Sequence, residues 1–235
     1  MSPDVVYPLR KGNYNDELRY SLRSLQNVPH GRVILSGHIP DWVTGFGTGQ
    51  VLGIIQDPQG SNWARARANI EAALDYCSDP FYLFNDDFYV MEPVAQIPIY
   101  HAGPLDKVIE RYRRKRHTGA YWKGMVSTYL LLQEWGISNP LGYELHLPML
   151  MYKEPLLEAL SKGNGIEALA LRTMYGNLAQ VGGIEREDCK VLARAGVLEY
   201  QSMPYLSSND DLSYSPLGKH LTMRFPLPSE YESHS

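Results

Sequence analysis

The chain has 235 residues, of which 44% are hydrophobic and 20% are charged, so it can bury a large core in one compact domain. An intrinsically disordered chain and a repeat protein are excluded, because the sequence has no low-complexity tract and no internal period. The formal net charge of −4 argues against a protein that coats nucleic acid through bulk charge, although it leaves room for a local basic patch.

Membrane insertion and secretion are not expected. The apolar runs are short and interrupted, and the first residues, Met1–Asp4, lack the basic and apolar stretches of a secretory signal. The two cysteines, Cys77 and Cys189, are too few for a disulfide framework. The sequence therefore predicts a protein of the reducing cytoplasm, without a membrane span.

Strand-like and helix-like segments alternate over residues 1–90. Short apolar runs bounded by Gly and Pro predict buried strands at residues 4–9, 32–36, 51–56 and 81–84. A helix with leucines at helical spacing follows the polar turn at 11–15, and Ser61 or Asn62 is expected to cap a second helix. This β-α-β-β-α-β order predicts an α/β fold with a mostly parallel sheet and helices on its faces.

The second half of the chain is less regular. Helices are predicted at residues 105–116, 121–135, 154–160 and 166–175. The chain from Tyr205 onward is rich in Ser, Pro and Tyr, which predicts a long ordered loop that folds back over a site. No linker separates the parts, so we expect one domain with a C-terminal subregion.

Two adjacent carboxylates and an amide, Asn85-Asp86-Asp87, stand where the strand at 81–84 ends. Ligands of parallel sheets bind at the carboxyl ends of the strands, and Mg²⁺ and Mn²⁺ prefer carboxylate oxygens together with substrate phosphates. A metal site is therefore favoured over the alternative, a simple turn. A second Asn-Asp-Asp, at residues 209–211, is interpreted as a turn, with His220 nearby as a candidate for a phosphate or metal contact.

Two other groups are candidates for catalysis and binding. Glu144 and His146 are two residues apart in an extended stretch, so they face one side and can act as base and orienter, or as base and metal ligand. Arg65, Arg67 and Asn69 can bind donor phosphates or sugar hydroxyls from a helix. The alternatives are structural, namely a core histidine and an arginine paired on a solvated helix face.

A basic run lies at Arg111–His117 and is followed by Tyr121, Trp122 and Lys123. This mixture of cations and aromatic rings is used to hold nucleic-acid backbones and bases. A solvated helix face is the alternative. The sequence contains no phosphate-binding Gly-rich loop with Lys and Ser or Thr, no zinc-ligand spacing and no nucleophile elbow.

A recognisable pattern is carried by Asp4–Tyr7, Asn15–Leu25, Pro40–Trp42 and Phe84–Phe88. These segments resemble the first two conserved regions of the Stealth family of sugar-phosphate transferases. Later parts of that family's pattern are similar to His146–Pro148 and Phe225–Glu232. The resemblance spans most of the chain and is most specific at residues 15–25 and 84–88. The ending is also similar to that of compact glycosyltransferases carried by bacteriophages of actinobacteria.

The resemblance implies a GT-A-type nucleotide-diphospho-sugar transferase fold. Residues 1–100 would form a nucleotide-sugar-binding half, and residues 101–235 an acceptor-side half with a C-terminal wrapping segment, in one compact domain. The resemblance puts Asn85-Asp86-Asp87 in the place of the metal-binding Asp-x-Asp element, with Asp87 as the safest metal ligand. With Arg65 added, the residues expected to bind the donor are Tyr7, Pro8, Arg10, Arg65, Arg67, Asn69, Asn85 and Asp86.

We therefore predict a metal-dependent glycosyltransferase that moves a sugar from a nucleotide diphosphate sugar to a hydroxyl acceptor. Mn²⁺ or Mg²⁺ on Asp87, with Asp86 or His220, would neutralise the charge that develops on the leaving diphosphate. Glu144 or His146 would deprotonate the acceptor in a reaction that inverts the anomeric centre, whereas a retaining reaction needs no such base.

The expected acceptor is a hydroxymethylated pyrimidine in phage DNA, modified in the host cytoplasm, with a saccharide or a protein as alternatives. The residues expected to contact DNA are Arg113, Arg114, Arg116 and Trp122. Two other functions compete with glycosyl transfer: a Stealth-like hexose-1-phosphate transferase acting on a polysaccharide, and a non-catalytic nucleic-acid-binding module. The sequence Tyr7-Pro8-Leu9 departs from the Stealth opening, which disfavours transfer of an intact sugar-phosphate.

Overall fold

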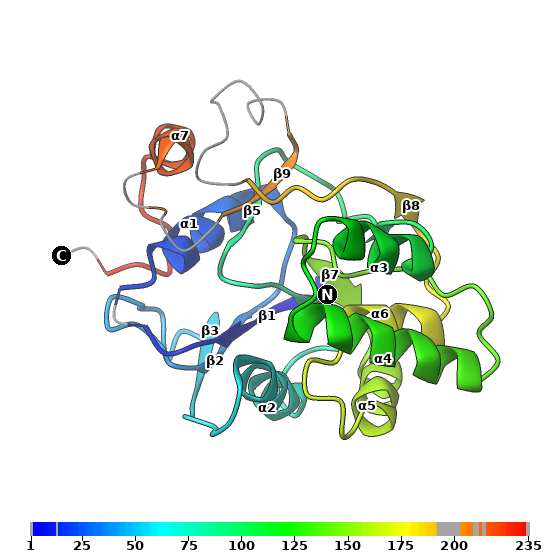
Figure 1. The fold of residues 1–235 in the computed structure, drawn as a ribbon. Helices are drawn as coiled ribbons and strands as arrows, with labels where there is room; N and C mark the ends of the chain where they lie inside the picture. Colours follow the sequence, from blue (N-terminus) through cyan, green and yellow to red (C-terminus); the bar gives the residue numbers. More distant parts are fainter. Residues whose placement is uncertain (1, 13, 192–202, 209–211, 213–214, 234–235) are drawn as a thin grey trace.

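A sheet with the strand order β3-β2-β1-β4-β7 lies at the centre of the computed structural model (Figure 1). The structure describes residues 2–12, 14–191, 203–208, 212 and 215–233. The strands of this sheet are β1 (Asp4–Leu9), β2 (Val33–Gly37), β3 (Val51–Ile55), β4 (Phe81–Leu83) and β7 (Met149–Met151). The first four run parallel to their neighbours and β7 is antiparallel to β4, which confirms the predicted mostly parallel sheet.

The central strand β1 is buried on both faces because its alternate side chains belong to two different cores. Val5 and Tyr7 point into the core that α1 (Asp16–Ser24) covers. Val6 points into the opposite core, which α2 (Asn62–Leu74) covers. In Figure 1 the two helices lie on opposite sides of the sheet. The chain order β1-α1-β2-β3-α2-β4 agrees with the predicted alternation of strands and helices.

The helices of the second half pack beside β4 and β7 and complete the core under α2. They are α3 (Leu105–Arg114), α4 (Ala120–Glu134), α5 (Lys153–Lys162) and α6 (Leu171–Leu178). The short strand β6 (Tyr100–His101) precedes these helices in the chain and pairs with β8 (Ile184–Glu185), which follows them. The first three of these helices confirm the predictions within a few residues at their ends. None of the described helices is long and apolar enough to cross a membrane.

The predicted helix at 166–175 is wrong in its first half, because residues 166–170 are not helical. The Ala170 amide donates to the hydroxyl of Thr128 in α4 at 3.2 Å instead of to a carbonyl one turn earlier. The carbonyl of Ala168 lies so close to Gly124 of α4 that a Cβ there would sit 1.8 Å from its oxygen. Contacts with α4 therefore override the helical spacing of this segment, and α6 begins later.

The C-terminal segment folds back as predicted, but it is not a loop throughout. β9 (Tyr205–Ser207) pairs antiparallel with β5 (Phe88–Val90), and α7 (Pro216–Arg224) follows. In Figure 1 α7 lies beside α1, and the Tyr20 hydroxyl of α1 hydrogen-bonds the Thr222 hydroxyl of α7 at 2.6 Å. The local sequence does not indicate these elements, because each of them is short and only tertiary pairing stabilises it.

The two halves expected on either side of residue 100 are joined by a shared sheet and by the C-terminal segment. β7 of the second half extends the sheet through β4 of the first. Glu232 is 2% exposed and accepts hydrogen bonds from Arg19 and Arg23 of α1, which continues into the short 3-10 helix η1 (Leu25–Asn27). The carboxyl ends of β1 and β4 therefore face segments from both halves.

Candidate active site

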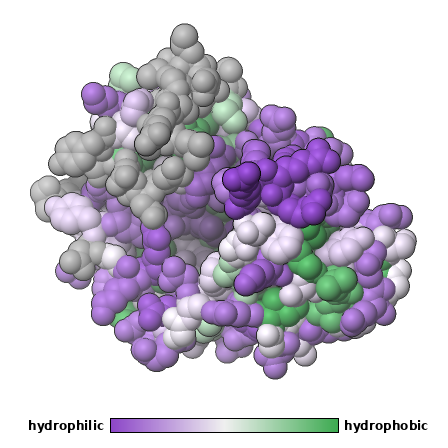
Figure 2. Space-filling view, viewed as in Figure 1, coloured by the Kyte–Doolittle hydropathy of each residue, from purple (hydrophilic) through white to green (hydrophobic). Residues whose placement is uncertain are grey.

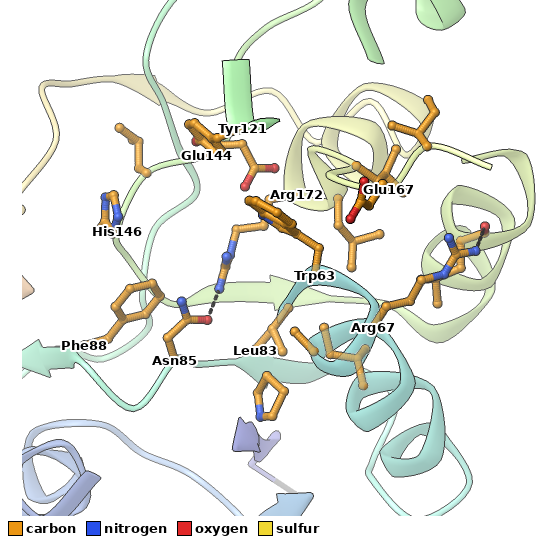
Figure 3. Close-up of a pocket in the computed structure, with 18 of the residues that line it drawn as sticks. Trp63, Arg67, Leu83, Asn85, Phe88, Tyr121, Glu144, His146, Glu167 and Arg172 are labelled. Atoms are coloured by element: carbon orange, nitrogen blue, oxygen red, sulfur yellow. Dashed lines mark hydrogen bonds between the residues drawn. The ribbon is translucent and has the colours of Figure 1, made fainter. Parts of the chain in front are cut away.

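A pocket of about 420 Å³, which we call the central pocket, opens where β1 and β4 end (Figure 3). The parallel register Val6↔Leu83 brings Pro8 and Asn85 to the same edge of the sheet, and both residues line this pocket. Trp63 of α2 is 37% exposed, and its ring lines the pocket too. The polar side chains of the lining are those of Arg67, Asn85, Glu144, His146, Glu167 and Arg172.

The turn Asn85-Asp86-Asp87 connects β4 to β5 and sends its side chains to different partners. Asn85 Oδ1 accepts a hydrogen bond from Arg172 Nη2 at 3.0 Å inside the central pocket. Asp86 Oδ2 accepts one from Asn15 Nδ2 at 2.9 Å, and the Asn15 side chain also caps α1. The segment is therefore a turn, as the structural alternative holds, and among its side chains that of Asn85 lines the central pocket.

Asp87 is held by residues from the C-terminal half of the chain. Its Oδ2 accepts a hydrogen bond from the Ser207 hydroxyl of β9 at 2.7 Å, and Lys190 Nζ lies 3.7 Å from the same oxygen. The Asp87 side chain is 15% exposed. Because Lys190 makes this contact, the segment 186–190 lies directly beside the turn.

The pair of carboxylates fits a divalent cation. Burial raises the pKa of Asp86 above its ordinary value, and the negative charge of Asp87 raises it further. A cation beside the pair would relieve this excess of negative charge. No group of three or more His, Cys, Asp or Glu side chains gathers as metal ligands in the described part of the chain. The cation would therefore take its other ligands from water and from a bound phosphate, as Mg²⁺ and Mn²⁺ do.

His146 forms a dyad with Asp188. Its Nδ1 lies 2.6 Å from Asp188 Oδ2, and its backbone amide donates to Asp188 Oδ1 at 2.9 Å. Since a carboxylate only accepts, Nδ1 carries the proton and Nε2 is the basic nitrogen of the neutral ring. Burial raises the pKa of Asp188, but the hydrogen bonds from His146 outweigh burial and hold that pKa below its ordinary value. Asp188 therefore stays ionised and orients the ring.

Glu144 and His146 both line the central pocket, but Leu145 between them lines it too, and the Leu145 amide donates to the Tyr143 carbonyl at 2.8 Å, so a tight turn interrupts the extended stretch that the sequence predicts. Glu144 Oε1 accepts a hydrogen bond from the backbone amide of Thr173 at 3.0 Å, in the first turn of α6. A carboxylate in this position stabilises a helix N-terminus. Glu144 thus has a structural contact, and the residue that orients His146 is Asp188 and not Glu144.

Arg172 is a buried cation of the central pocket. Besides its bond to Asn85, its guanidinium lies 5.3 Å from the centre of the Phe88 ring, and the buried Nε has no hydrogen-bond partner among the described residues. Burial lowers the pKa of Arg172, against the opposing effect of the charges of Glu144 and Asp87. Figure 3 shows the side chain reaching across the pocket toward Asn85. An incompletely paired, buried guanidinium of this kind is suited to an anionic ligand.

A second pocket, of about 480 Å³, lies beyond the end of β1, and we call it the end pocket. Arg10, Lys11 and Arg65 line it, and the buried Nε of Arg65 has no hydrogen-bond partner among the described residues. Asn15, which donates to Asp86, also lines the end pocket. The carboxylate turn therefore lies between the end pocket and the central pocket.

Three residues predicted to bind the donor have structural contacts. Tyr7 is 0% exposed and its hydroxyl bonds a serine of α1, while Asn69 is 2% exposed and donates to the carbonyl of Leu9. Arg67 lines the central pocket, but it donates to the Leu160 carbonyl of α5, and in Figure 3 it points away from Asn85. The predicted donor residues that line the two pockets are Pro8, Arg10, Arg65 and Asn85, and Asp86 contacts the end pocket only through its hydrogen bond with Asn15.

His220, predicted as a metal ligand, stands on α7 and lines neither the central pocket nor the end pocket. Burial and the positive charge of Arg224 lower the pKa of His220. The described residues do not place it in a group of metal ligands with Asp87. The second Asn-Asp-Asp, at 209–211, lies outside the described residues.

The basic run predicted to contact DNA divides into two faces of α3. Arg113 and Arg114 approach Glu110 at 2.7 Å and 3.0 Å, and their hydrogen bonds hold the pKa of the Glu110 carboxyl down at about 2. Arg111 and Lys115 instead line a third pocket, of about 460 Å³, which we call the flank pocket. One carboxylate, that of Glu110, therefore offsets part of the positive charge on the face that carries these predicted DNA contacts.

Two further residues predicted to contact DNA lie outside all three pockets. The indole N–H of Trp122 donates to the Ile109 carbonyl at 3.1 Å and ties α4 to α3. Arg116 follows α3 in a left-handed conformation with φ of 59°, exposed to solvent. Trp122 therefore has a packing role, and Arg116 extends from the end of the helix.

Sequence reasoning missed Arg172, Asp188 and Lys190. Residues 185–190 mix acidic and basic side chains, which is typical of a solvated loop, and no motif surrounds Arg172. The one available signal is the position of Arg172 in the predicted helix at 166–175, the helix whose start the structure corrects. The chain matches no protein-family model, and no curated protein matches it either. A function is therefore argued from the residues of the site.

Proposed function

We propose that this chain is a GT-A-type glycosyltransferase, which moves a sugar from a nucleotide diphosphate sugar to a hydroxyl acceptor. The observation that carries the proposal is the arrangement around the central pocket of the carboxylate turn, the buried Arg172 and the His146–Asp188 dyad. The turn, with a bound cation, and Arg172 offer positive charge to a diphosphate, and the dyad offers a base to a hydroxyl.

Contacts between the segments that resemble the Stealth family support the proposal. Asn15 belongs to the first of the two most specific segments and Asp86 to the second, and their side chains are hydrogen-bonded at 2.9 Å. Arg23 of the first segment donates twice to Glu232 of the closing segment, each time at 2.7 Å. Residues that carry the resemblance are thus joined in space, although they are far apart in the chain.

The donor would lie along the carboxyl edge of the sheet, with its nucleotide in the end pocket and its sugar in the central pocket. Arg10, Lys11 and Arg65 offer charge-assisted hydrogen bonds to phosphates. The rings of Trp63 and Phe88 line the central pocket and offer apolar surface to a sugar. This order puts the diphosphate beside the carboxylate turn.

Each protein group then has a defined part in the displacement. Mn²⁺ or Mg²⁺ held by Asp87 and Asp86 would supply neutralising charge for the diphosphate. Arg172 donates hydrogen bonds to the diphosphate oxygens as the bond between the sugar C1 and the phosphate oxygen breaks and the nucleoside diphosphate leaves. Nε2 of His146 accepts the proton of the acceptor hydroxyl as its oxygen bonds to C1, and Asp188 stabilises the imidazolium. Attack assisted by such a base inverts the anomeric centre.

The test measures donor binding and nucleotide release with the purified protein. Thermal stability is followed with a panel of nucleotide diphosphate sugars, with and without Mn²⁺, and the nucleotide released on prolonged incubation is identified. We expect one nucleotide sugar to stabilise the protein selectively and to release nucleoside diphosphate. Release of nucleoside monophosphate would identify a hexose-1-phosphate transferase instead. Wild-type protein that is neither stabilised nor able to release a nucleotide contradicts the proposal.

A further inference from the structure

The flank pocket adjoins the central pocket and shares a wall with it. Five residues line both, namely Tyr112, Tyr121, Glu144, Leu145 and His146. His146, the proposed base, is therefore accessible from both sides of this wall. A molecule in the flank pocket can present a hydroxyl to His146 while the central pocket holds the donor sugar.

The rim of the flank pocket carries cations that the protein does not neutralise. Arg111 and Lys115 are one turn apart on α3 and line the pocket, and in the described structure neither lies within ion-pair distance of a carboxylate. His117 lines the same rim. Figure 2 shows the surface over α3 as a strongly hydrophilic patch. On the other face of the helix, Arg113 and Arg114 are paired with Glu110.

Most of the carboxylates of the flank pocket already have partners in the protein. Asp188 is hydrogen-bonded to the His146 ring, and Glu144 accepts the Thr173 amide. Glu187 is the remaining carboxylate of the lining. Lys190 also lines the pocket, but it contacts Asp87. These hydrogen bonds do not cancel the charges of the carboxylates, so the positive charge of the pocket is confined to the α3 side of the rim, where Arg111 and Lys115 lie.

We propose that the flank pocket binds the acceptor and that this acceptor carries a phosphate group held by Arg111 and Lys115. That the bound molecule accepts a sugar rests on the proposed function, whereas the phosphate site rests only on the cations Arg111 and Lys115. The pocket, of about 460 Å³, suits one phosphorylated unit, such as a nucleotide or a hexose phosphate, and not an extended duplex. The rings of Tyr112 and Tyr121, with centres 5.7 Å apart, offer apolar surface to a base or a sugar.

In this arrangement the transfer step moves one proton, forms one bond and breaks one bond. The acceptor hydroxyl loses its proton to Nε2 of His146, and its oxygen forms the new bond to C1 of the donor sugar. The bond from C1 to the diphosphate oxygen breaks, and the nucleoside diphosphate leaves with that electron pair. The phosphate of the acceptor takes no part in bond making, and it holds the hydroxyl at the shared wall.

The test compares two double variants that remove the same charge from opposite faces of α3. Arg111→Gln with Lys115→Gln removes the rim cations, and Arg113→Gln with Arg114→Gln is the matched control. Calorimetry measures the affinity of thymidine monophosphate and of a hexose monophosphate, each against its unphosphorylated counterpart. In wild type we expect the phosphate to increase affinity about tenfold or more, with loss of this preference in the rim variant alone. The dependence of affinity on salt also becomes weaker in the rim variant.

The outcomes show which kind of molecule carries the phosphate, and they test the phosphate site separately from the proposed function. A preference confined to thymidine monophosphate identifies a nucleotide acceptor, and one confined to the hexose monophosphate identifies a saccharide. No preference in wild type, a preference that survives in the rim variant, or an equal loss in the control variant overturns the inference. Nucleotide-sugar stabilisation is measured on the same preparations. Its absence from wild type contradicts the proposed function, while a phosphate preference that depends on Arg111 and Lys115 still supports the phosphate site.

Discussion

Three ionisable side chains in and around the central pocket decide what the site can do. Arg172 is buried with an unpaired Nε, Asp188 is kept ionised by the His146 ring, and Asp86 carries a raised pKa beside a second carboxylate. Each has a specific partner, and each also has capacity left for a ligand, because buried charges are costly unless they are paired. The pocket is thus arranged for charged and polar substrates although much of its lining is apolar.

Replacing Arg172 with glutamine tests whether this cation serves a diphosphate. We expect kcat for transfer to fall by about a hundredfold to a thousandfold, as when one donor to a developing charge is lost. The melting temperature is expected to change little, because part of the guanidinium has no partner in the protein. Arg67→Gln is the control, because Arg67 lines the same pocket but bonds α5. It should lose about 1 kcal/mol of stability and keep its rate. A normal kcat in Arg172→Gln excludes the assigned role.

Replacing Asp188 with asparagine tests the orienting carboxylate. The amide can hold His146 in the wrong tautomer, so we expect kcat to fall by about a hundredfold to ten-thousandfold with unchanged donor affinity. His146→Ala should cost about as much, and the double variant no more than either alone, because the two side chains act as a unit. Initial rates and calorimetric donor affinities measure this. Independent, multiplying losses in the double variant would show that the two residues do not form one base.

At the scale of elements, short segments far apart in the chain hold one another in place. The carboxylate turn after β4 is held by Asn15 at the start of α1 and by Ser207 of β9. The N-terminus of α6 is held by Glu144. The C-terminal segment is held to α1 through the buried Glu232. Each contact joins the end of one element to another, where backbone or side-chain polar groups need partners.

The buried Glu232 predicts an acid-sensitive link between α1 and the C-terminal segment. Burial raises the pKa of Glu232, but hydrogen bonds from Arg23 and Ser229 outweigh burial and keep that pKa below its ordinary value. A carboxyl whose pKa is lowered on folding stabilises the folded state fully at pH values above its ordinary pKa of about 4.3. This stability is lost as the pH falls through the lowered pKa. The link is therefore complete at neutral pH and weakens in acid.

Glu232→Gln should destabilise the protein by about 3 to 5 kcal/mol at neutral pH, because it breaks a buried ion pair. The difference from wild type should shrink as pH falls below the ordinary carboxyl pKa of about 4.3 and through the lowered pKa of Glu232, where the wild-type carboxyl protonates. Urea unfolding at neutral and at acid pH measures it. Glu71→Gln is the control, since its side chain is 47% exposed and its pair with Arg67 contributes about 0.5 kcal/mol. An equal, pH-independent loss in both variants would contradict the prediction.

At the scale of the whole molecule, the parallel sheet sets the order of the pockets. The carboxyl ends of β1 and β4 lie at one edge, with the end pocket beyond β1 and the central pocket beyond both strands. The flank pocket continues this row behind the shared wall that contains His146. A donor and an acceptor bound in this row would meet at the base.

This arrangement of pockets predicts that the metal and the donor, bound together, raise the free energy of unfolding of the whole protein. A nucleotide sugar with Mn²⁺ at a hundred times its dissociation constant should add about 2.7 kcal/mol to the free energy of unfolding. Asp87→Asn should abolish this gain and transfer, and leave the unliganded protein nearly as stable, because the amide can still accept from Ser207. Thermal unfolding with and without ligand measures it, with EDTA as a second control. Equal stabilisation of both proteins would exclude Asp87 as the metal ligand.

The sequence alone determined the parts of the fold that follow from local pattern. Neighbouring residues specify the apolar runs of β1 to β4, the leucines of α1 and the serine cap of α2. The order of these elements and the mostly parallel sheet could therefore be predicted. The same holds for the turn after β4, whereas the tight turn at Glu144 is not indicated by the local sequence. Sites at strand ends can be located in this way because topology fixes where those ends meet.

Only the tertiary structure decided which of these residues share a site. Asp188 and Lys190 lie in a mixed-charge segment, and Arg172 lies in a helix whose start is set by contacts with α4, so nothing local singled them out. The same holds for Tyr7 and Asn69, which the resemblance puts near the donor and whose burial and hydrogen bonds within the protein only the structure shows. The physical reason is that a charge acquires its role from partners distant in the chain, through burial and hydrogen bonds that the local sequence does not specify.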